Sequence, residues 1–553
     1  MKTKIKPTTA YFSMEIGLDK KLHTYSGGLG VLAGDTLKSA ADLGIPVIGV
    51  SLIHRKGYLH QEITKGYQVD FEDPWDVEKY CKKISKSVVV PLFDKTITVT
   101  GHIYEIKGVQ GHIVPILFLD TSENSDEYFK NLTDRLYGGD QQYRLCQEIV
   151  LGIAGTKLLK ELGYKIETHH MNEGHASLLT LELLKMEKGS FEQRIENVKK
   201  KCVFTTHTPV AAGHDVFPFD MATNALSQLD DNLKDYALTN GSLNTTLLAL
   251  KSSHFSNAVA RKHGFVSKDM FPEHKIHYIT NGIHVNTWMH KEIKNLVNEY
   301  VPLWESHPES IKEVMAAPNS KVFEAHQKAK SLFINYINKK QDANFNADTF
   351  TIGFARRATG YKRSHLLFKD VERLKKISEE KGGLQIVYAG KSHPNDTEGK
   401  EHMKRVLETG YNLPGDIKFV YLSEYDMDLA KVMIPGVDIW LNTPLRPKEA
   451  SGTSGMKAAA NAVPSLSILD GWWIEGHMEG ITGWAIGTEN DSNENQDDND
   501  SLELYRKLDI IVPLYYLKRD EWITVMKSAL AINASYFNTN RMVKEYVSRA
   551  YFR

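Results

Sequence analysis

Lys457 ends a run of small residues in the stretch KEASGTSGMK. Glycine, serine and threonine can present several backbone N–H groups to an anion, and a lysine inside a site can form a Schiff base with an aldehyde cofactor. The spacing excludes the phosphate loop of nucleotide hydrolases, which needs four residues between its glycines. Here only two residues lie between Gly452 and Gly455. On these residues alone, a surface lysine on a small-residue turn is an equal alternative.

A second group of residues is basic and follows a predicted strand, in the stretch GFARRATGYKRSH. Open α/β sheets bind ligands at the carboxyl ends of their strands. Guanidinium groups and a lysine ammonium are what a phosphate dianion requires. The stretch therefore predicts a phosphate site, with a solvated basic turn as the alternative. Its cations are Arg356, Arg357, Lys362 and Arg363.

A glycine-rich stretch, SGGLGVLAGD, begins at Ser26 and opens a predicted helix. Free N–H groups and the positive end of a helix dipole would suit a phosphate. The glycine spacing also fits a dinucleotide fingerprint, but about a dozen residues separate it from the preceding strand, and that fingerprint needs a tight turn. Phosphate binding and close packing of a turn are equal alternatives here.

Histidine and asparagine recur in HHMNEGH, TTHTP and TNGI. The histidines lack the spacing of zinc ligands, so no metal site is predicted. We expect Asn172, His175 and His207 to recognise a polar substrate. The alternative is that the histidines make their hydrogen bonds within the core. Asn281 can both donate and accept, which suits a sugar hydroxyl, and a plain turn is its alternative.

Alternating strand-like and helix-like segments must position these residues, and they predict an α/β fold with mostly parallel sheets. The first part has strand candidates at 10–14, 47–53, 88–92, 114–119, 203–206 and 276–279, a hairpin arm at 95–106 and a helix from Asp140 to Leu162. A polar break at 339–348 predicts an interdomain connection. After it, strand candidates at 350–354, 384–388, 417–421, 437–441 and 465–469 predict a doubly wound domain.

The predicted domains are residues 1–345, residues 346–520 and a C-terminal helical segment, 521–553, that packs back on the first domain. The acidic stretch 489–500 predicts a solvated loop. The chain of 553 residues is long enough for two large domains.

Bulk composition excludes several classes of protein. The net charge of −1 gives no field that would attract nucleic acid or an anionic membrane. The three cysteines are few and widely spaced, which argues against a disulfide framework and a structural zinc site. The N-terminus lacks an apolar signal core, and no apolar run approaches the roughly 20 residues that span a bilayer. We expect a cytoplasmic protein.

Taken together, these stretches resemble the α-glucan phosphorylases, the family of glycogen, starch and maltodextrin phosphorylases. EASGTSGMK is similar to the family's pyridoxal-phosphate lysine segment, in which a glutamate leads the lysine by eight residues, and Glu449 and Lys457 keep that interval. RRATGYKR, SGGLG, MNEGH, TTHTP and TNGI resemble further segments of the family. All six follow the family's order along the chain.

The resemblance implies two Rossmann-like doubly wound domains that face a central cleft, the glycosyltransferase-B fold. It implies pyridoxal 5'-phosphate on Lys457, used for its phosphate and not as an electron sink. The implied reaction is reversible, configuration-retaining phosphorolysis of an α-glucan (glycogen, starch or maltodextrin) by inorganic phosphate, which yields α-glucose 1-phosphate. The family also tends to form homodimers.

Site residues follow from motif position. The resemblance gives catalytic roles to Arg357, Lys362, His207 and Lys457. It places the cofactor against Lys457, Thr453, Ser454, Arg356 and Tyr425. It places inorganic phosphate against Gly28, Leu29, Arg357 and Lys362. It places the sugar substrate against Glu449, Ser451, Gly452, Asn281, His207, Tyr361, Asn172 and His175.

Two departures fit a short, divergent branch of the family. Ser454-Gly455 stands where the family has Gly-Asn, and the triplet at 358–360 stands where it has Ile-His-Glu. Only about ten residues precede the first predicted strand, so we expect no regulation by an N-terminal phosphorylation segment or the associated nucleotide site. One alternative is a nucleotide-sugar glycogen or starch synthase, which carries a second glutamate where this chain has Lys457. The other is a non-catalytic glucan-binding protein of the same fold.

Overall fold

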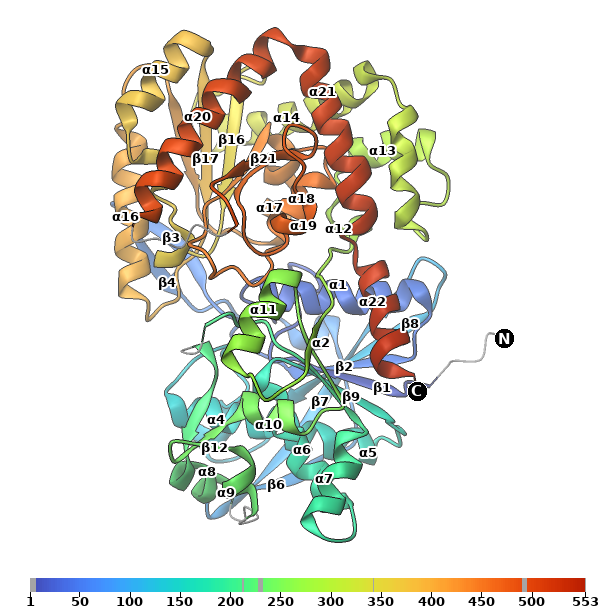
Figure 1. Ribbon diagram of the computed structural model, residues 1–553. Coiled ribbons are helices and arrows are strands. Elements are labelled where there is room, and N and C mark those ends of the chain that lie inside the picture. The colour runs from blue at the N-terminus through green and yellow to red at the C-terminus, as the bar shows by residue number, and fades with distance from the viewer. Residues whose placement is uncertain (1–5, 211–212, 227–231, 342, 490–494, 553) are drawn as a thin grey trace. The chain divides into compact units, whose positions relative to one another are not determined.

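The structure is a computed structural model that describes residues 6–210, 213–226, 232–341, 343–489 and 495–552 (Figure 1). The chain forms two compact units. Unit 1 comprises Met1–Tyr58, Glu72–Thr280 and Met542–Arg553, and unit 2 comprises Leu59–Phe71 and Asn281–Arg541. The chain therefore passes between the units four times. The predicted class, α/β with parallel sheets, is confirmed in both units.

The large sheet of unit 1 is parallel over most of its width. In spatial order its strands are β15 (Ile276–Tyr278), β14 (Phe255–Ala258), β10 (Cys202–Thr205), β9 (Thr168–Asn172), β1 (Thr9–Phe12), β2 (Val47–Leu52), β8 (Ile113–Asp120), β7 (Lys95–Lys107) and β5 (Lys82–Lys83), with β6 (Val88–Leu92) beside β7. The predicted hairpin arm is β7, which pairs antiparallel with β6 and β8. Strand order reverses at β1, which lies between β9 and β2.

Helices cover this sheet. They are α1 (Gly28–Leu43), α2 (Val77–Tyr80), α3 (Glu127–Lys130), α4 (Gln141–Ile149), α5 (Gly155–Glu161), α6 (Leu179–Met186), α7 (Phe191–Lys199), α8 (Phe219–Leu226), α9 (Asn232–Ala237), α10 (Thr245–Lys251) and α11 (Arg261–Met270). A small antiparallel sheet contains β11 (Val216–Pro218), β13 (Ser242–Asn244) and β12 (Leu238–Thr239).

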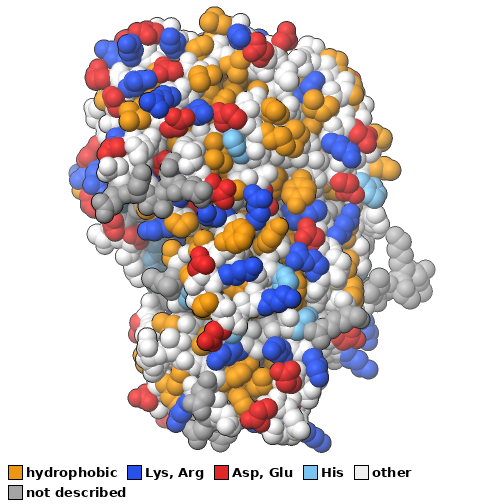
Figure 2. All heavy atoms as spheres, in the orientation of Figure 1, with side chains coloured by type: hydrophobic (Ala, Val, Ile, Leu, Met, Phe, Trp, Pro, Cys, Tyr) orange, Lys and Arg blue, Asp and Glu red, His pale blue; other side chains and the backbone are white. Residues whose placement is uncertain are grey.

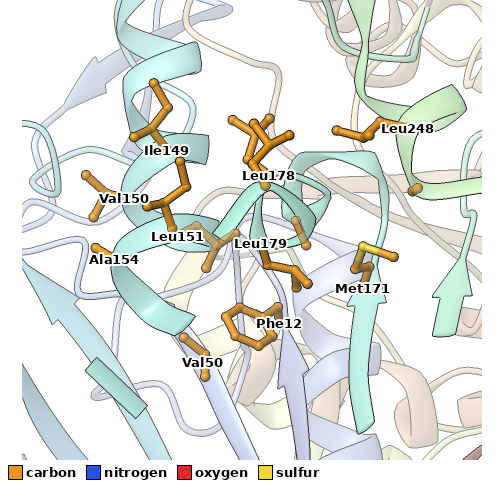
Figure 3. Packing of buried hydrophobic residues seen from close by; sticks show 14 of the residues in the cluster. Phe12, Val50, Ile149, Val150, Leu151, Ala154, Met171, Leu178, Leu179 and Leu248 are labelled. Atoms are coloured by element: carbon orange, nitrogen blue, oxygen red, sulfur yellow. The ribbon is translucent and has the colours of Figure 1, made fainter. Parts of the chain in front are cut away.

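The helix predicted from Asp140 to Leu162 forms as α4 and α5, joined by a π-helical turn. Its predicted cap is confirmed, because the Asp140 carboxylate accepts a hydrogen bond from the Tyr143 N–H at 2.8 Å. Figure 3 shows the apolar side chains of this helical segment packed over Phe12 of β1 and Val50 of β2. This packing buries the apolar side chains of the sheet. It thereby fixes the positions of the strand ends that carry candidate site residues.

The sheet of unit 2 is parallel throughout its paired strands. Its spatial order is β18 (Lys418–Leu422), β17 (Leu384–Ala389), β16 (Phe350–Ala355), β19 (Ile439–Asn442), β20 (Ser465–Ile468) and β21 (Gly483–Ile486). The doubly wound pattern predicted for this region is confirmed, and β21 is an additional strand. Strand order reverses between β16 and β19, which are neighbours in space although β17 and β18 lie between them in the sequence.

Helices of unit 2 are α12 (Val285–Trp288), α13 (Lys291–Tyr300), α14 (Asn319–Gln341), α15 (Val371–Lys381), α16 (Thr397–Tyr411), α17 (Met427–Met433), α18 (Ser454–Ala459), α19 (Trp473–Gly476), α20 (Gln496–Leu517) and α21 (Arg519–Ser528). An inserted hairpin, β3 (His60–Thr64) with β4 (Tyr67–Phe71), also belongs to this unit. Its Gln68 side chain pairs with both the N–H and the C=O of Ser392, at 2.9 and 2.8 Å.

The polar break at 339–348 does not separate the units, which corrects the prediction of an interdomain connection there. Its first residues complete α14, and its last residues lead directly into β16. Both flanks belong to unit 2, since the unit begins at Asn281. The break is polar because it is a surface turn: Asn338 caps it by hydrogen bonds to both backbone groups of Phe345.

The acidic stretch 489–500 is also different from the predicted solvated loop. Residues 490–494 lie outside the described part, but α20 begins at Gln496 and includes the last aspartates. Asp500 is only 1% exposed and binds Arg363 and Arg446. Acidic residues suit the first turn of a helix, and here they also meet buried guanidinium groups.

The C-terminal segment belongs to unit 1 from Met542 onward, after the first residues of α22 (Thr539–Tyr546). The Tyr551 hydroxyl lies 2.7 Å from His170 Nδ1 on β9, and Tyr546 accepts from Asn257 on β14 at 3.0 Å. The segment therefore supplies both apolar and polar partners to the face of the unit 1 sheet.

Candidate active site

The two most informative motifs meet because β16 and β19 are adjacent parallel strands, with Ile352 opposite Ile439 and Gly353 opposite Trp440. The basic stretch follows β16 and the Lys457 stretch follows β19. Carboxyl ends of parallel strands lie at the same edge of a sheet, and a reversal of strand order opens a crevice there. The topology thus explains how residues about 90 positions apart form one site.

A buried ion-pair cluster joins the two loops. Glu449 Oε2 lies 2.7 Å from Arg356 Nη2 and 2.6 Å from Lys362 Nζ, and each of the three side chains is 10% exposed. Burial alone would raise the pKa of Glu449, but the charges of Arg356 and Lys362 outweigh it and lower the pKa to about 2. Glu449 is therefore a carboxylate at any physiological pH.

Tyr361 ties the same loops together. Its carbonyl accepts a hydrogen bond from Leu445 N at 2.7 Å, and its ring centroid lies 4.4 Å from Lys362 Nζ. Burial opposes ionisation of its phenol, yet the nearby Lys362 charge lowers the pKa below its ordinary value. Arg357 is exposed beside this cluster.

Arg363 is an exception to the predicted phosphate group of four cations. It is 3% exposed, and its guanidinium donates to Asp500 at 2.6 Å and Asp497 at 2.9 Å. It also donates to the carbonyl groups of Thr443 and Pro444. Because two carboxylates already neutralise it, Arg363 stabilises the loops and does not offer its charge to a ligand.

Lys457 lies in α18 and is 8% exposed. Its Nζ is 3.6 Å from the centre of the Trp288 ring. The Asn461 side chain donates to the carbonyl groups of both Lys457 and Trp288, at 2.8 and 2.9 Å, and so fixes the two residues together. A buried amine against an indole wall fits an aromatic aldehyde cofactor.

Other residues predicted around the cofactor are positioned by the same elements. Thr453 precedes α18 as its N-cap residue, and Ser454 donates to Asn442, the last residue of β19, at 3.2 Å. Tyr425 lies just before α17, and burial raises the pKa of its phenol, which keeps it a hydrogen-bond donor. Ser451 is 3% exposed and Gly452 has φ +78°, in the loop between Glu449 and α18.

Asn281 is 4% exposed, and its side-chain Oδ1 has no hydrogen-bond partner among the described residues. The Arg541 guanidinium instead donates to its backbone carbonyl at 3.1 Å. Buried amides are normally paired, so an unsatisfied acceptor supports the prediction of a polar ligand contact here.

Unit 1 gathers its own candidates at the carboxyl ends of β9 and β10. His207 Nε2 lies 2.7 Å from Asn172 Oδ1, and burial lowers the pKa of His207 far below its ordinary value. A neutral His207 therefore donates through Nε2. Glu173 adopts a left-handed φ of +81° and accepts from His207 N at 2.7 Å and Thr208 Oγ1 at 3.0 Å. Such strain in a non-glycine residue is concentrated at functional sites.

His175 links two strand ends through its Nε2. Its Nε2 accepts from Met14 N at 2.9 Å, so it joins the end of β1 to the segment after β9. Burial lowers the pKa of His175 to about 3. The Asn172 side chain donates to Ser13 Oγ at 3.1 Å across the same strand ends. Both residues thus lie at the reversal of strand order in unit 1.

The glycine-rich turn lies at the start of α1, where Gly28 is exposed and Leu29 is half-buried. The Glu15 carboxylate accepts from the N–H groups of Ser26 and Gly27, at 2.6 and 3.2 Å. The later glycines are required by packing, because a Cβ on Gly30 would lie 2.7 Å from the Tyr25 Cβ and one on Gly34 would lie 1.8 Å from the Gly17 carbonyl oxygen. Close helix packing therefore accounts for the part of the motif that suggested a dinucleotide.

Three carboxylates of these sites, Glu15, Glu173 and Asp470, were not predicted. Each holds backbone N–H groups of a predicted site residue or of its immediate neighbours. The only sequence signal is position, since each follows a strand closely.

Among the described residues, no group of three or more His, Cys, Asp or Glu side chains could hold a metal ion, and no helix is both long and apolar enough to cross a membrane. Figure 2 shows charges of both signs interspersed on the visible face.

A family model described as carbohydrate phosphorylase matches residues 18–114 and 237–490. The chain belongs to the carbohydrate phosphorylase family. It is 38% identical to a maltodextrin phosphorylase of Thermococcus litoralis, over 98% of this chain and 70% of that protein. It is 35% identical to a glycogen phosphorylase of Aquifex aeolicus, over 99% of this chain and 86% of that protein. An uncharacterized protein of Methanocaldococcus jannaschii is 31% identical over 99% of this chain and 100% of its own length.

The carbohydrate phosphorylase match confirms the predicted family. It includes the glycine-rich turn, the basic stretch and the Lys457 stretch. It does not include residues 115–236, which carry Asn172, His175 and His207. The full-length relatives cover that segment as well, so the family assignment extends over nearly the whole chain.

Proposed function

We propose that the protein is an α-1,4-glucan phosphorylase. It removes terminal glucose from glycogen, starch or a maltodextrin by reversible phosphorolysis and releases α-glucose 1-phosphate with retained configuration. The observation that carries the proposal is the buried cluster of Arg356, Lys362 and Glu449, with Lys457 in the helix that follows the Glu449 loop, in a chain of the carbohydrate phosphorylase family. Cations fixed in a buried site suit a reaction that handles phosphate.

The proposed architecture is the glycosyltransferase-B fold, in which two Rossmann-like doubly wound domains face a central cleft. Each unit supports this by itself. Each contains a parallel sheet with a reversal of strand order, and each carries candidate site residues at the carboxyl ends beside that reversal. Ligands of open α/β sheets bind at such positions.

The proposed cofactor is pyridoxal 5'-phosphate, tethered by Lys457. The buried amine, the Trp288 ring beside it and the half-buried Tyr425 fit an aromatic ring with polar substituents. Arg356, Thr453 and Ser454 would hold its phosphate. When bound, the cofactor supplies a phosphate group that shares a proton with the substrate phosphate.

Arg357 and Lys362 would hold inorganic phosphate, with help from the N–H groups of Gly28 and Leu29. Two neighbouring phosphates repel each other, so several cations are needed to keep both ionised. Glucose hydroxyls would be bound by polar groups of both units. These are Glu449, Ser451, Gly452, Asn281, Tyr361, His207, Asn172 and His175.

The chemical step that we propose uses the substrate phosphate twice. It first protonates the leaving glycosidic oxygen, and it then attacks the sugar cation from the same face, which retains the configuration. Lys362 and Arg357 keep the phosphate in place between these two events. The Glu449 carboxylate fixes the sugar and balances the surrounding positive charge.

Phosphate-dependent release of glucose 1-phosphate from maltooligosaccharides of graded length tests this function. We expect release only when phosphate is present, and an absorbance band of pyridoxal phosphate that Lys457→Ala abolishes. Turnover only with ADP-glucose or UDP-glucose as donor would favour the nucleotide-sugar synthase instead. Glucan binding without turnover, and without a pyridoxal band, would favour a non-catalytic binding protein.

A further inference from the structure

Asp470 follows β20 and is 3% exposed, although the roles proposed above do not use it. Its Oδ2 accepts from the backbone N–H of Glu449 at 2.9 Å. Its Oδ1 accepts from the N–H of Gly471, also at 2.9 Å. One buried carboxylate therefore holds the main chain at two places, Glu449 and Gly471. Glu449 is the residue that pairs with Lys362.

The residues after Asp470 contact the same loop. Trp472 N donates to the Ser451 carbonyl at 2.9 Å. Gly471 has φ +56°, and a Cβ at this position would lie 2.4 Å from the Ser451 carbonyl oxygen. Only glycine permits that backbone approach. The turn 470–472 thus clamps the loop that carries Glu449, Ser451 and Gly452.

We infer that Asp470 is a positioning residue for phosphate and sugar binding, acting through Glu449. It fixes the Glu449 backbone, so the Glu449 carboxylate reaches Arg356 and Lys362 at 2.7 and 2.6 Å. A displaced Glu449 would release those cations from their present geometry. The inference rests on the proposed function for the identity of the ligands, and on the two hydrogen bonds of Asp470 for the link to Glu449.

The same sheet offers a matched control at the opposite end of its strands. Asp438 is 1% exposed and accepts from Lys330, from His326 and from Thr351 N, just before β19. It is as buried and as well bonded as Asp470, but its partners lie at the amino ends of the strands. Asp438→Asn therefore reports the cost of neutralising a buried aspartate away from the site.

The protonation state of Asp470 gives a second way to distinguish a positioning role from a purely structural one. Burial raises the pKa of Asp470 to about 7; the negative charge of Glu449 reinforces this shift, and the N–H groups of Glu449 and Gly471 and the charge of Lys362 oppose it. Above that pH the carboxylate makes charge-assisted bonds to both N–H groups. Below it, the protonated acid resembles the asparagine of Asp470→Asn. The effect of Asp470→Asn on KM for phosphate should therefore grow with pH. Dividing the KM of the variant by the KM of the unmodified protein at each pH removes the contribution from titration of phosphate itself.

The test compares Asp470→Asn, Asp470→Glu and Asp438→Asn with the unmodified protein. For Asp470→Asn we expect KM for inorganic phosphate to rise about tenfold at pH 8.5, the scale of one hydrogen bond to a charged group, with kcat and the pyridoxal absorbance nearly unchanged. At pH 6 the rise should nearly vanish. Asp470→Glu keeps the charge but moves the carboxylate by one methylene, and it should also raise KM.

Asp438→Asn should lower the unfolding temperature without changing KM. An unchanged KM in both Asp470 variants, or an equal rise in Asp438→Asn, would overturn the inference. Calorimetric titration with inorganic phosphate separates this outcome from failure of the proposed function. If the unmodified protein binds phosphate but shows no phosphorolysis, weaker phosphate binding by Asp470→Asn still supports the positioning role, and equal binding rejects it.

Discussion

Replacing Glu449 with glutamine should destabilise unit 2 by an amount that the structure sets. The pKa of Glu449 falls from an ordinary 4.5 to about 2 in the folded protein. One pKa unit corresponds to about 1.4 kcal/mol, so the folded state favours the carboxylate by about 3 kcal/mol. Glutamine removes that charge and leaves Arg356 and Lys362 buried side by side without it. We therefore expect the free energy of unfolding to fall by about 3 kcal/mol at pH 7.

The pH dependence follows from the sign of the shift. Because the folded pKa lies below the unfolded one, the stabilisation is complete above about pH 4.5 and is lost as the pH falls toward 2. The difference between Glu449→Gln and the unmodified protein should be constant from pH 7 to about 5 and then narrow. Urea unfolding followed by tryptophan fluorescence at several pH values measures it.

Glu324→Gln is the matched control for this substitution. Glu324 also pairs with a lysine, Lys328, at 2.8 Å, but both side chains are 56% exposed on α14. Exposed pairs of this kind contribute little, so its unfolding curve should match that of the unmodified protein. Equal stability of Glu449→Gln and the unmodified protein at pH 7, or a difference that persists unchanged to pH 3, would refute the electrostatic reasoning.

Three further substitutions are informative. Lys362→Ala should weaken phosphate binding by about 1.5–3 kcal/mol while the pyridoxal absorbance remains, and unchanged phosphate kinetics would show that the phosphate lies elsewhere. Asp500→Asn breaks the contacts to Arg363 and Arg446, so it should lower the free energy of unfolding by about 3 kcal/mol in urea titrations and raise KM for phosphate; no change in either would contradict the role given to the acidic stretch. Lys330→Met leaves Asp438 without its lysine and should cost about 3–5 kcal/mol in the same titrations, whereas KM for phosphate should stay constant; a raised KM would mean that the Asp438 network reaches the site.

Strand prediction worked where the buried strand is mostly apolar and was incomplete where it is polar. β2 and β16 are buried runs with a single polar residue each, and both were predicted to within a residue. β14 contains Ser256 and Asn257, and β9 contains two histidines, so neither strand has an apolar pattern. Asn257 and His170 bond to Tyr546 and Tyr551, which are about 290 and 380 residues away from them. A local sequence pattern contains no information about partners so far away in the chain.

The site shows the same division. The resemblance predicted roles for Glu449 and Lys457 from their interval, and the strand pattern predicted that the basic stretch directly follows a strand, which is β16. The sequence did not predict toward which partner each charged side chain points. Arg363 is one residue from Lys362, yet a left-handed φ of +47° turns it toward Asp500 and away from the neighbouring cluster. The supporting carboxylates, such as Asp470, lie on other loops, and no spacing rule connects them to Glu449.

The C-terminal segment has a consequence for synthesis of the protein. Residues that close the face of the first sheet, including Tyr546 and Tyr551, are translated after all of unit 2. A nascent chain released from the ribosome domain by domain normally completes its first domain first. Here the first unit to emerge lacks the tyrosine partners of His170 and Asn257 until Tyr546 and Tyr551 leave the exit tunnel. Unit 2 can finish folding before unit 1 does, so the order of completion is the reverse of the order of emergence.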